Sequence, residues 1–281
     1  MHSIVLFGIL GLVWGLRYLW SQMVLDTWRV RWYYTITLFL FPTLHLFTTA
    51  ISIILMGPHG RMVWMGNDWL SYYLAICFLG LMGLSLLKQS LGAWQLLHQV
   101  RTYPIADVDG NHIRLLDLET PYLAQIGFWQ PELVISQGLM LALDAEHRAA
   151  AIAHERAHYH YHDTFYFFWL GWVRQVTAWL PQTDMMWQEL LILREIRADR
   201  WASAQTDPLL VAEALLSIAQ YTPVFPEYLC AAFSQMTAPN RLDRRIEALI
   251  TTTDPIERPS IWSWAWLLLA LLPLFAVPFH I

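Results

Sequence analysis

The chain has 281 residues, of which 57% are hydrophobic and 14% are charged. Soluble domains carry about 25% charged residues, so this composition excludes an ordinary soluble protein and predicts that lipid solvates part of the chain. The net charge of −5 comes with no basic stripe, which gives no reason to expect nucleic acid as a direct partner. With only Cys77 and Cys230, neither a disulfide framework nor a cysteine zinc site is available.

Four apolar runs are long enough to cross the roughly 30 Å hydrocarbon core of a bilayer, which takes about 20 helical residues. They cover residues 4–23, 33–56, 69–87 and 261–279. The first run has no basic start and no small-residue cleavage site, so we expect a retained span rather than a signal peptide. The lipid bilayer is therefore an expected partner.

Basic residues indicate how these spans are oriented. Arg29 and Arg31 lie in the first loop, close to Arg17, whereas the next loop has no such excess. The positive-inside rule then places the first loop in the cytoplasm and the N-terminus outside. Three crossings leave residues 88–260 in the cytoplasm, and a fourth span within 261–281 returns the C-terminus to the outside of the cell membrane.

The cytoplasmic segment is long enough for one compact domain with its own core. Short apolar runs bounded by turn residues predict strands over 112–118 and 131–136. An Ala-rich helical pattern follows, with Asp144 as its expected N-cap. Two more helices are predicted, roughly over 164–180 and 184–205. We expect a small strand layer packed by several helices.

Residues 154–158 read His-Glu-Arg-Ala-His, an HExxH motif. Residues four apart on a helix lie on the same face one turn apart, so His154 and His158 can bind one metal ion. Glu155, between them, can act as general base toward a water at the metal. A catalytic zinc also needs a third protein ligand and an open position.

Three sources for the third ligand can be compared. The metzincin pattern requires Gly and His where this chain has Tyr161 and Thr164, which excludes that class. His162 continues the row of histidines but lies about 12 Å along the axis from the first, too far unless the helix breaks. A later helix carries Glu195 and Asp199 one turn apart. Glu195 can complete the coordination while Asp199 accepts a hydrogen bond from a ligand imidazole, as in the gluzincin class.

The segment 165–180, "FYFFWLGWVRQVTAWL", is apolar enough to suggest a fifth span. It is short and contains Arg174 and Gln175, and a crossing here would separate Glu195 from His154. We therefore expect this helix to lie in the membrane interface or to be buried in the domain.

Two longer stretches carry a closer resemblance: "TPYLAQIGFWQPELVISQGLMLALDAEHRAAAIAHERAHYHYHD" and "AWLPQTDMMWQELLILREIRADRWA". Together they resemble the core of the BlaR/MecR-type antirepressor metallopeptidases, and "NRLDRRIEAL" is similar to the helix that closes such domains. The resemblance covers most of residues 105–250. Three spans before the zinc domain and one after it also match the membrane plan of that family.

The resemblance implies a membrane-embedded gluzincin-like zinc metalloendopeptidase with an α+β protease domain. Its expected substrate is a cytoplasmic winged-helix transcriptional repressor of the BlaI type, or the chain itself. Residue by residue, the family pattern assigns one zinc ion to His154, His158 and Glu195, the general base to Glu155, and support of a ligand to Asp199. No pattern in the sequence indicates an oligomeric state.

The chain departs from the best-known members of that family in two respects. Those members continue past the fourth span into an extracellular penicillin-binding sensor domain, which these 281 residues do not include, so we expect no β-lactam sensing through it. The basic residues that follow the motif in the family are here Tyr161 and His162, so that surface is not carried over.

Several nearby residues have simpler interpretations. His160 and His162 are expected to face solvent or to support ligands rather than to bind the metal. Asp163 is expected to cap the next helix, with orientation of a neighbouring side chain as the alternative. Three arginines near the end of the domain are expected to form an exposed helix face, with substrate contact by the first or the last as the alternative: Arg241, Arg244 and Arg245.

Three alternatives remain beside the antirepressor hypothesis. An HtpX or CaaX-type membrane quality-control protease shares both motifs but usually has a different arrangement of spans. A site-2-type intramembrane protease is disfavoured because the HExxH helix is too charged for lipid. A non-catalytic membrane receptor or scaffold with a structural zinc would give Glu155 no required role, and structural zinc sites usually have four protein ligands with cysteine prominent.

Overall fold

A computed structural model describes residues 2–23, 27–58, 69–219, 239–250 and 266–279. The described chain is mostly helical with one small mixed sheet, which confirms the predicted mainly α class with a β layer. It divides into two compact units. The helical unit comprises Met1–Lys88, Leu170–Leu190 and Asp254–Ile281, and the mixed unit comprises Gln89–Trp169 and Leu191–Thr253.

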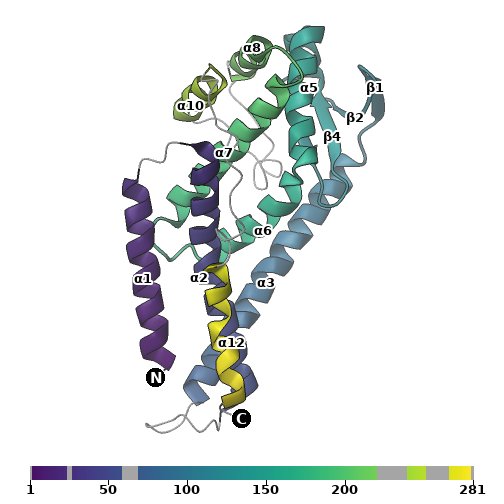
Figure 1. Ribbon diagram of the computed structural model, residues 1–281. Helices are drawn as coiled ribbons and strands as arrows, with labels where there is room; N and C mark the ends of the chain where they lie inside the picture. Colours follow the sequence, from purple (N-terminus) through teal and green to yellow (C-terminus); the bar gives the residue numbers. More distant parts are fainter. Residues whose placement is uncertain (1, 24–26, 59–68, 220–238, 251–265, 280–281) are drawn as a thin grey trace. The chain divides into compact units, whose positions relative to one another are not determined.

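The helical unit is built around α2 (Trp28–Met56). This helix packs against α1 (His2–Gln22) and against a C-terminal segment made of η1 (Trp266–Leu271), α12 (Leu272–Ala276) and η2 (Val277–Phe279) (Figure 1). Arg17 of α1 is fully buried, and its guanidinium donates to the Thr183 hydroxyl at 2.9 Å and to the Leu38 carbonyl at 3.3 Å. The unit thus supplies the polar partners that an arginine in an apolar helix requires.

Two described helices, α2 and α3 (Trp69–Val100), are long and apolar enough to cross a membrane, by length and composition. The expected third span ends at Leu87, but α3 continues without a break to Val100. The fourth expected span differs more. From residue 266 onward it is a short α-helix between two 3₁₀ turns, because Pro273 and Pro278 lack the N–H that a continuous α-helix needs. Residues 261–265 lie outside the described chain.

The mixed unit contains a four-stranded sheet in the order β1-β2-β4-β3. The strands are β1 (Ile105–Val108), β2 (Asn111–Leu116), β3 (Leu123–Ile126) and β4 (Glu132–Ser136). β2 and β4 are parallel, with Arg114 opposite Val134, and the two outer pairs are antiparallel. The structure confirms the two predicted strands, β2 and β4. The other two have only four residues each, too few for an alternating pattern to identify them.

Both faces of the sheet are covered, and this holds the helix that carries the HExxH motif in place. On one face Leu116, Ile126 and Val134 pack with Leu96 and Val100 from the end of α3. On the other face, Ile135 packs with Leu139 of α4 (Gln137–Ala142) and Ile152 of α5 (Ala145–His160). Burial of these aliphatic side chains stabilises the unit by about 1.5–3 kcal/mol each, so α5 is fixed against a rigid layer.

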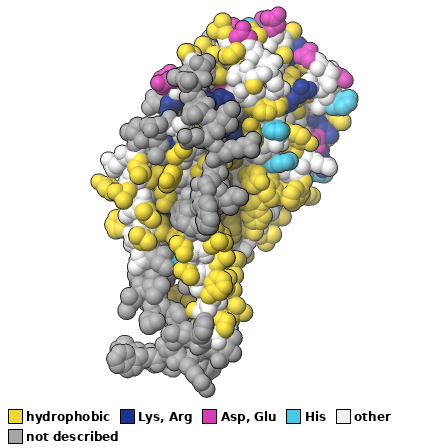
Figure 2. Space-filling view, viewed as in Figure 1, with side chains coloured by type: hydrophobic (Ala, Val, Ile, Leu, Met, Phe, Trp, Pro, Cys, Tyr) yellow, Lys and Arg dark blue, Asp and Glu magenta, His cyan; other side chains and the backbone are white. Residues whose placement is uncertain are grey.

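The remaining helices follow α5 in sequence. They are α6 (Asp163–Val176), α7 (Thr183–Ser203), α8 (Pro208–Ala219) and α10 (Pro239–Ile250). In Figure 2, charged and histidine side chains gather over the part of the mixed unit formed by α5, α8 and β1, whereas the visible described surface of the helical unit is largely hydrophobic.

The N-terminus of α5 is capped as predicted. The Asp144 carboxylate accepts a hydrogen bond from the His147 N–H at 3.0 Å. The His147 ring also lies between two carboxylates, with Nδ1 2.7 Å from Asp144 and Nε2 3.0 Å from Glu213 of α8. Glu213, and then Asp144, raise the pKa of His147. One imidazolium therefore links α5 to α8.

This link predicts a pH dependence of stability. A histidine whose folded pKa is raised contributes stability fully below its unfolded pKa of about 6.5, and loses it as pH rises through the folded value. We expect the free energy of unfolding of the wild-type chain to fall above about pH 6.5 relative to that of His147→Gln. Denaturant unfolding of both proteins in the same detergent and with a chelator, at several pH values, measures the difference. Parallel pH curves would contradict this role.

Candidate metal centre

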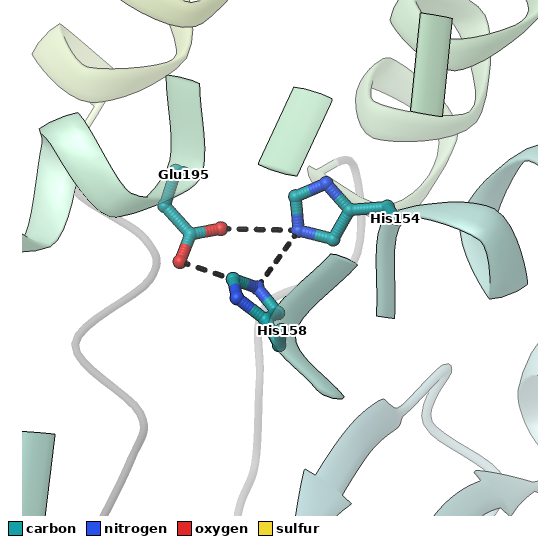
Figure 3. A group of neighbouring side chains, drawn as sticks. All are labelled: His154, His158 and Glu195. Atoms are coloured by element: carbon teal, nitrogen blue, oxygen red, sulfur yellow. Dashed lines mark hydrogen bonds and ion pairs between the residues drawn. The ribbon is translucent and has the colours of Figure 1, made fainter. Parts of the chain in front are cut away.

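Three buried side chains converge on one point in the mixed unit. His154 and His158 come from α5 and Glu195 from α7, and one ligand atom of each lies within 4.8 Å of the others (Figure 3). The two Nε2 atoms are 3.2 Å apart. The Glu195 carboxylate oxygens lie 3.2 Å from Nε2 of His154 and 3.7 Å from Nε2 of His158. This group could hold a metal ion.

Apolar packing holds the helices around this group. Ala150 and Ala153 of α5 are buried in one cluster with Ala202 of α7, and Val211 of α8 and Leu249 of α10 belong to the same cluster. The imidazoles at positions 154 and 158 share one face of α5, as the i, i+4 spacing predicts, and that face meets Glu195.

Carboxylates on the far side of each imidazole fix which nitrogen faces the ion. Nδ1 of His154 lies 2.8 Å from the Asp199 carboxylate, and Nδ1 of His158 lies 2.8 Å from that of Asp163. The His158 contact is a hydrogen bond, and since a carboxylate only accepts, Nδ1 of His158 carries the proton and a neutral ring presents its Nε2 lone pair to the centre. The His154 contact is a close ion pair between its ring and Asp199. Paired carboxylate–histidine contacts of this kind orient metal ligands.

Arginines balance the negative charge around the centre. Arg194 donates to one oxygen of Glu195 at 2.7 and 2.9 Å, and Arg245 of α10 lies 3.5 Å from the other. Burial opposes ionisation of Glu195, but these arginines and His158 outweigh it and hold the pKa of Glu195 well below its usual value. Arg197 pairs with Asp163, whose pKa is also lowered, against burial, by His158 and arginine charges. Both carboxylates are therefore anionic at neutral pH.

The donor set fits a divalent metal of the zinc type. The two Nε2 atoms lie 3.2 Å apart, a hydrogen-bond distance, so one of them carries a proton between the rings, and a bound metal ion would take the place of that proton. One oxygen of Glu195 is buried without a hydrogen-bond partner among the described residues, as a metal-ligating oxygen would be. Two imidazoles and one carboxylate match the ligand set of catalytic zinc sites. Burial disfavours the imidazolium form, yet Asp199 raises the pKa of His154 to about 9, so metal binding at neutral pH would displace a proton.

Glu155 lies between the two histidines in sequence and is also buried. Its carboxylate accepts a hydrogen bond at 3.0 Å from the backbone N–H of Gln125 in β3. β3 is an outer strand of the sheet, so this N–H is free of the ladder on that side. Electrostatic attraction to Arg245 acts on the same carboxylate. Glu155 is thus held by a backbone hydrogen bond and is not one of the three converging groups.

The prediction that Arg245 lies on an exposed face of α10 is wrong. This side chain is only 7% exposed and donates to both oxygens of Asp199, at 2.7 and 2.8 Å. Arg244 is half-buried, and the side chain of Arg241 lies outside the described residues. Arg245 shares a helix face with Leu242 and Leu249. A charged residue within an apolar stripe is the sequence feature that could have indicated its burial. Two buried carboxylates offset the cost of removing it from water.

The structure also places the other histidines and Asp163. His160, the last residue of α5, and His162 are both exposed and lie outside the converging group. Asp163 does not cap α6; it lies in the first turn of that helix and its carboxylate binds His158 and Arg197. The contact with His158 matches the alternative expected for Asp163, orientation of a neighbouring side chain. It forms because His162 adopts a left-handed conformation (φ 53°) that reverses the chain.

Comparison with known proteins adds no family assignment. No family model matches the chain, and a search of curated proteins gives no significant match.

The metal centre generates a prediction for Asp199. Asp199→Asn removes the carboxylate that orients His154 and should weaken zinc binding by about 10–100-fold. Competition with a chromophoric chelator measures the affinity. His162→Ala, on an exposed histidine outside the group, serves as the matched control and should bind as the wild type does. Equal affinity of the Asp199 variant and the control would contradict the supporting role.

The Arg245–Asp199 pair generates a second prediction. Arg245→Met leaves a buried carboxylate without its partner and should lower the free energy of unfolding by about 3–5 kcal/mol. The pair of Arg148 and Asp109 supplies the control, because the Asp109 side chain is 40% exposed and water can solvate it, so Arg148→Met should cost at most about 1 kcal/mol. Denaturant unfolding with a chelator present compares the two variants. Similar small losses would mean that Asp199 does not depend on Arg245.

Proposed function

We propose that the chain is a membrane-bound zinc metallopeptidase. The convergence of His154, His158 and Glu195 supports a zinc ion, with both imidazoles oriented by carboxylates. Glu155 supports hydrolysis, because a buried carboxylate next to a three-ligand centre has no role in a purely structural site. The single observation that carries the proposal is this pairing of an incomplete ligand set with an adjacent base.

The residues of the chain would divide the work of peptide hydrolysis. A bound zinc ion would supply Lewis-acid polarisation of the scissile carbonyl. Glu155 would accept a proton from the attacking water and deliver it to the leaving amine. The Gln125 N–H would hold the Glu155 carboxylate toward the reacting groups, since it donates to one oxygen and leaves the other for water. Asp199 and Asp163 would keep His154 and His158 in position.

The proposed setting is the cell membrane, with the protease domain in the cytoplasm. Two apolar helices, α2 and α3, support membrane crossing. The four-span arrangement, with both termini outside, extends this from the apolar runs and the positive-inside rule. A cytoplasmic winged-helix repressor of the BlaI type, or the chain itself, is the proposed substrate, on the basis of the resemblance of residues 105–250 to BlaR/MecR-type antirepressors.

The test separates catalysis from metal binding. Glu155→Gln removes the base but none of the three ligands, so we expect unchanged zinc content and a loss of cleavage of about 10²–10⁴-fold. Glu195→Ala should lose both. Purified chains in detergent are compared by metal analysis, by release of fragments of the chain itself and by hydrolysis of a quenched fluorescent peptide library.

Each outcome of this comparison has a distinct meaning. Wild-type cleavage by Glu155→Gln would refute the proposed mechanism. Stoichiometric zinc without any hydrolysis by the wild-type chain would instead favour a receptor or scaffold with a structural metal. Cleavage of a winged-helix repressor in preference to unfolded proteins would favour antirepressor signalling over quality control.

A further inference from the structure

An aromatic surface without charged residues lies beside the metal centre in the mixed unit. It is formed by the β3–β4 loop and the first half of α6. Phe128 contacts Phe165 and Phe168, with ring centroids 4.8 and 5.0 Å apart, and Trp129 contacts Phe165 at 4.7 Å. We call this set the aromatic surface: Phe128, Trp129, Phe165, Tyr166, Phe168 and Trp169.

Much of this surface is exposed. Trp129 is 73% exposed, Tyr166 55% and Trp169 38%. The loop 127–131 and residues 164–173 of α6 contain no charged side chain. The opposite face of α6 is already buried through Phe167, Leu170 and Val173, so the exposed aromatic side chains are a second apolar face. Contiguous exposed aromatic residues of this kind mark a binding surface.

Contacts with α3 give the position of this surface along that helix. α3 has 32 residues, or about 48 Å at about 1.5 Å per residue, more than the roughly 30 Å of a hydrocarbon core. Its first charged residue is Lys88. In the helical unit Trp172 of α6 donates to the Met82 carbonyl and the Ser85 hydroxyl at 3.1 and 3.0 Å. In the mixed unit Gln89 donates to the Phe168 carbonyl at 2.6 Å.

α6 therefore contacts α3 on either side of Lys88, the one Lys, Arg, Asp or Glu residue of that helix, where its long apolar run ends. If α3 crosses the bilayer, that level is the membrane–water interface, where tryptophan and tyrosine are enriched. An amphipathic helix with an apolar aromatic face binds lipid in this position. The loop that carries Trp129 packs on the same side chains of α6, so it reaches the same level.

We propose that the aromatic surface inserts into the lipid headgroup region and seats the protease domain on the membrane. This inference rests on the proposed membrane crossing of α3. Asp163, which binds His158, and Phe165 of the aromatic surface share the first turn of α6. The metal centre would consequently lie close to the membrane surface and act on peptide segments held near that surface.

Site-specific fluorescence in phosphatidylcholine nanodiscs tests the proposal. The full chain carries Cys77→Ser and Cys230→Ser, and one cysteine is introduced for a bimane label by Trp129→Cys. Leu141→Cys, on an apolar side chain 89% exposed in α4, is the matched control. Leu81→Cys, 67% exposed within the apolar run of α3, reports the membrane crossing itself. Unchanged thermal unfolding of each labelled chain verifies the fold.

We expect lipids with a nitroxide at the headgroup to quench the label at position 129 several-fold more than the label at 141. Lipids with a nitroxide near the acyl end should quench most strongly at 81. Equal lipid quenching at 129 and 141 would overturn the proposal and indicate that position 129 faces solvent. A label at 129 that is shielded from water in detergent as much as in nanodiscs would also overturn it and indicate that protein covers this position. Absence of quenching at 81 would overturn the membrane crossing together with the seating.

Discussion

The buried carboxylate of Asp199 is the interaction on which the metal centre depends. It lies 2.8 Å from the His154 ring on α5 and accepts two hydrogen bonds from Arg245 on α10. Three helices therefore meet at one side chain, which is only 1% exposed. Because a buried charge without partners is costly, α5, α7 and α10 hold each other in register. Through Arg245, α10 therefore contributes directly to the candidate metal centre.

Hydrophobic packing supplies the rigidity that this polar network needs. The sheet is covered on both faces, and α5 is packed on one of them through Ile152. The same sheet contributes the Gln125 N–H that holds Glu155. The proposed base and the candidate ligands are thus positioned by helices and a strand rather than by loops, which favours precise geometry.

The proposed catalytic and membrane roles share α6. Its first turn carries Asp163, which orients His158, and its next residues form the aromatic surface. A shift of α6 at the membrane would therefore act on a metal ligand through one carboxylate. This coupling offers a physical route from the lipid surface, or from whatever displaces α6 there, to the metal centre.

The sequence by itself determined the candidate metal ligands and much of the helical framework. The i, i+4 spacing of His154 and His158 and the apolar runs rest on local periodicity, which a single sequence displays. Asp144 as N-cap, β2 and β4 were predicted on the same basis. The convergence of Glu195 with the histidines was predicted from the likeness of the two motifs to the gluzincin class.

Only the tertiary structure decided which side chains complete the centre. Arg245 and Asp163 were expected in simpler roles, because contacts across helices depend on packing that local spacing does not encode. β1 and β3 are strands only through pairing with their neighbours, each being too short for its own pattern. The cost of burying charge then selects the partners: Arg245 becomes buried because Asp199 and Glu195 are already there.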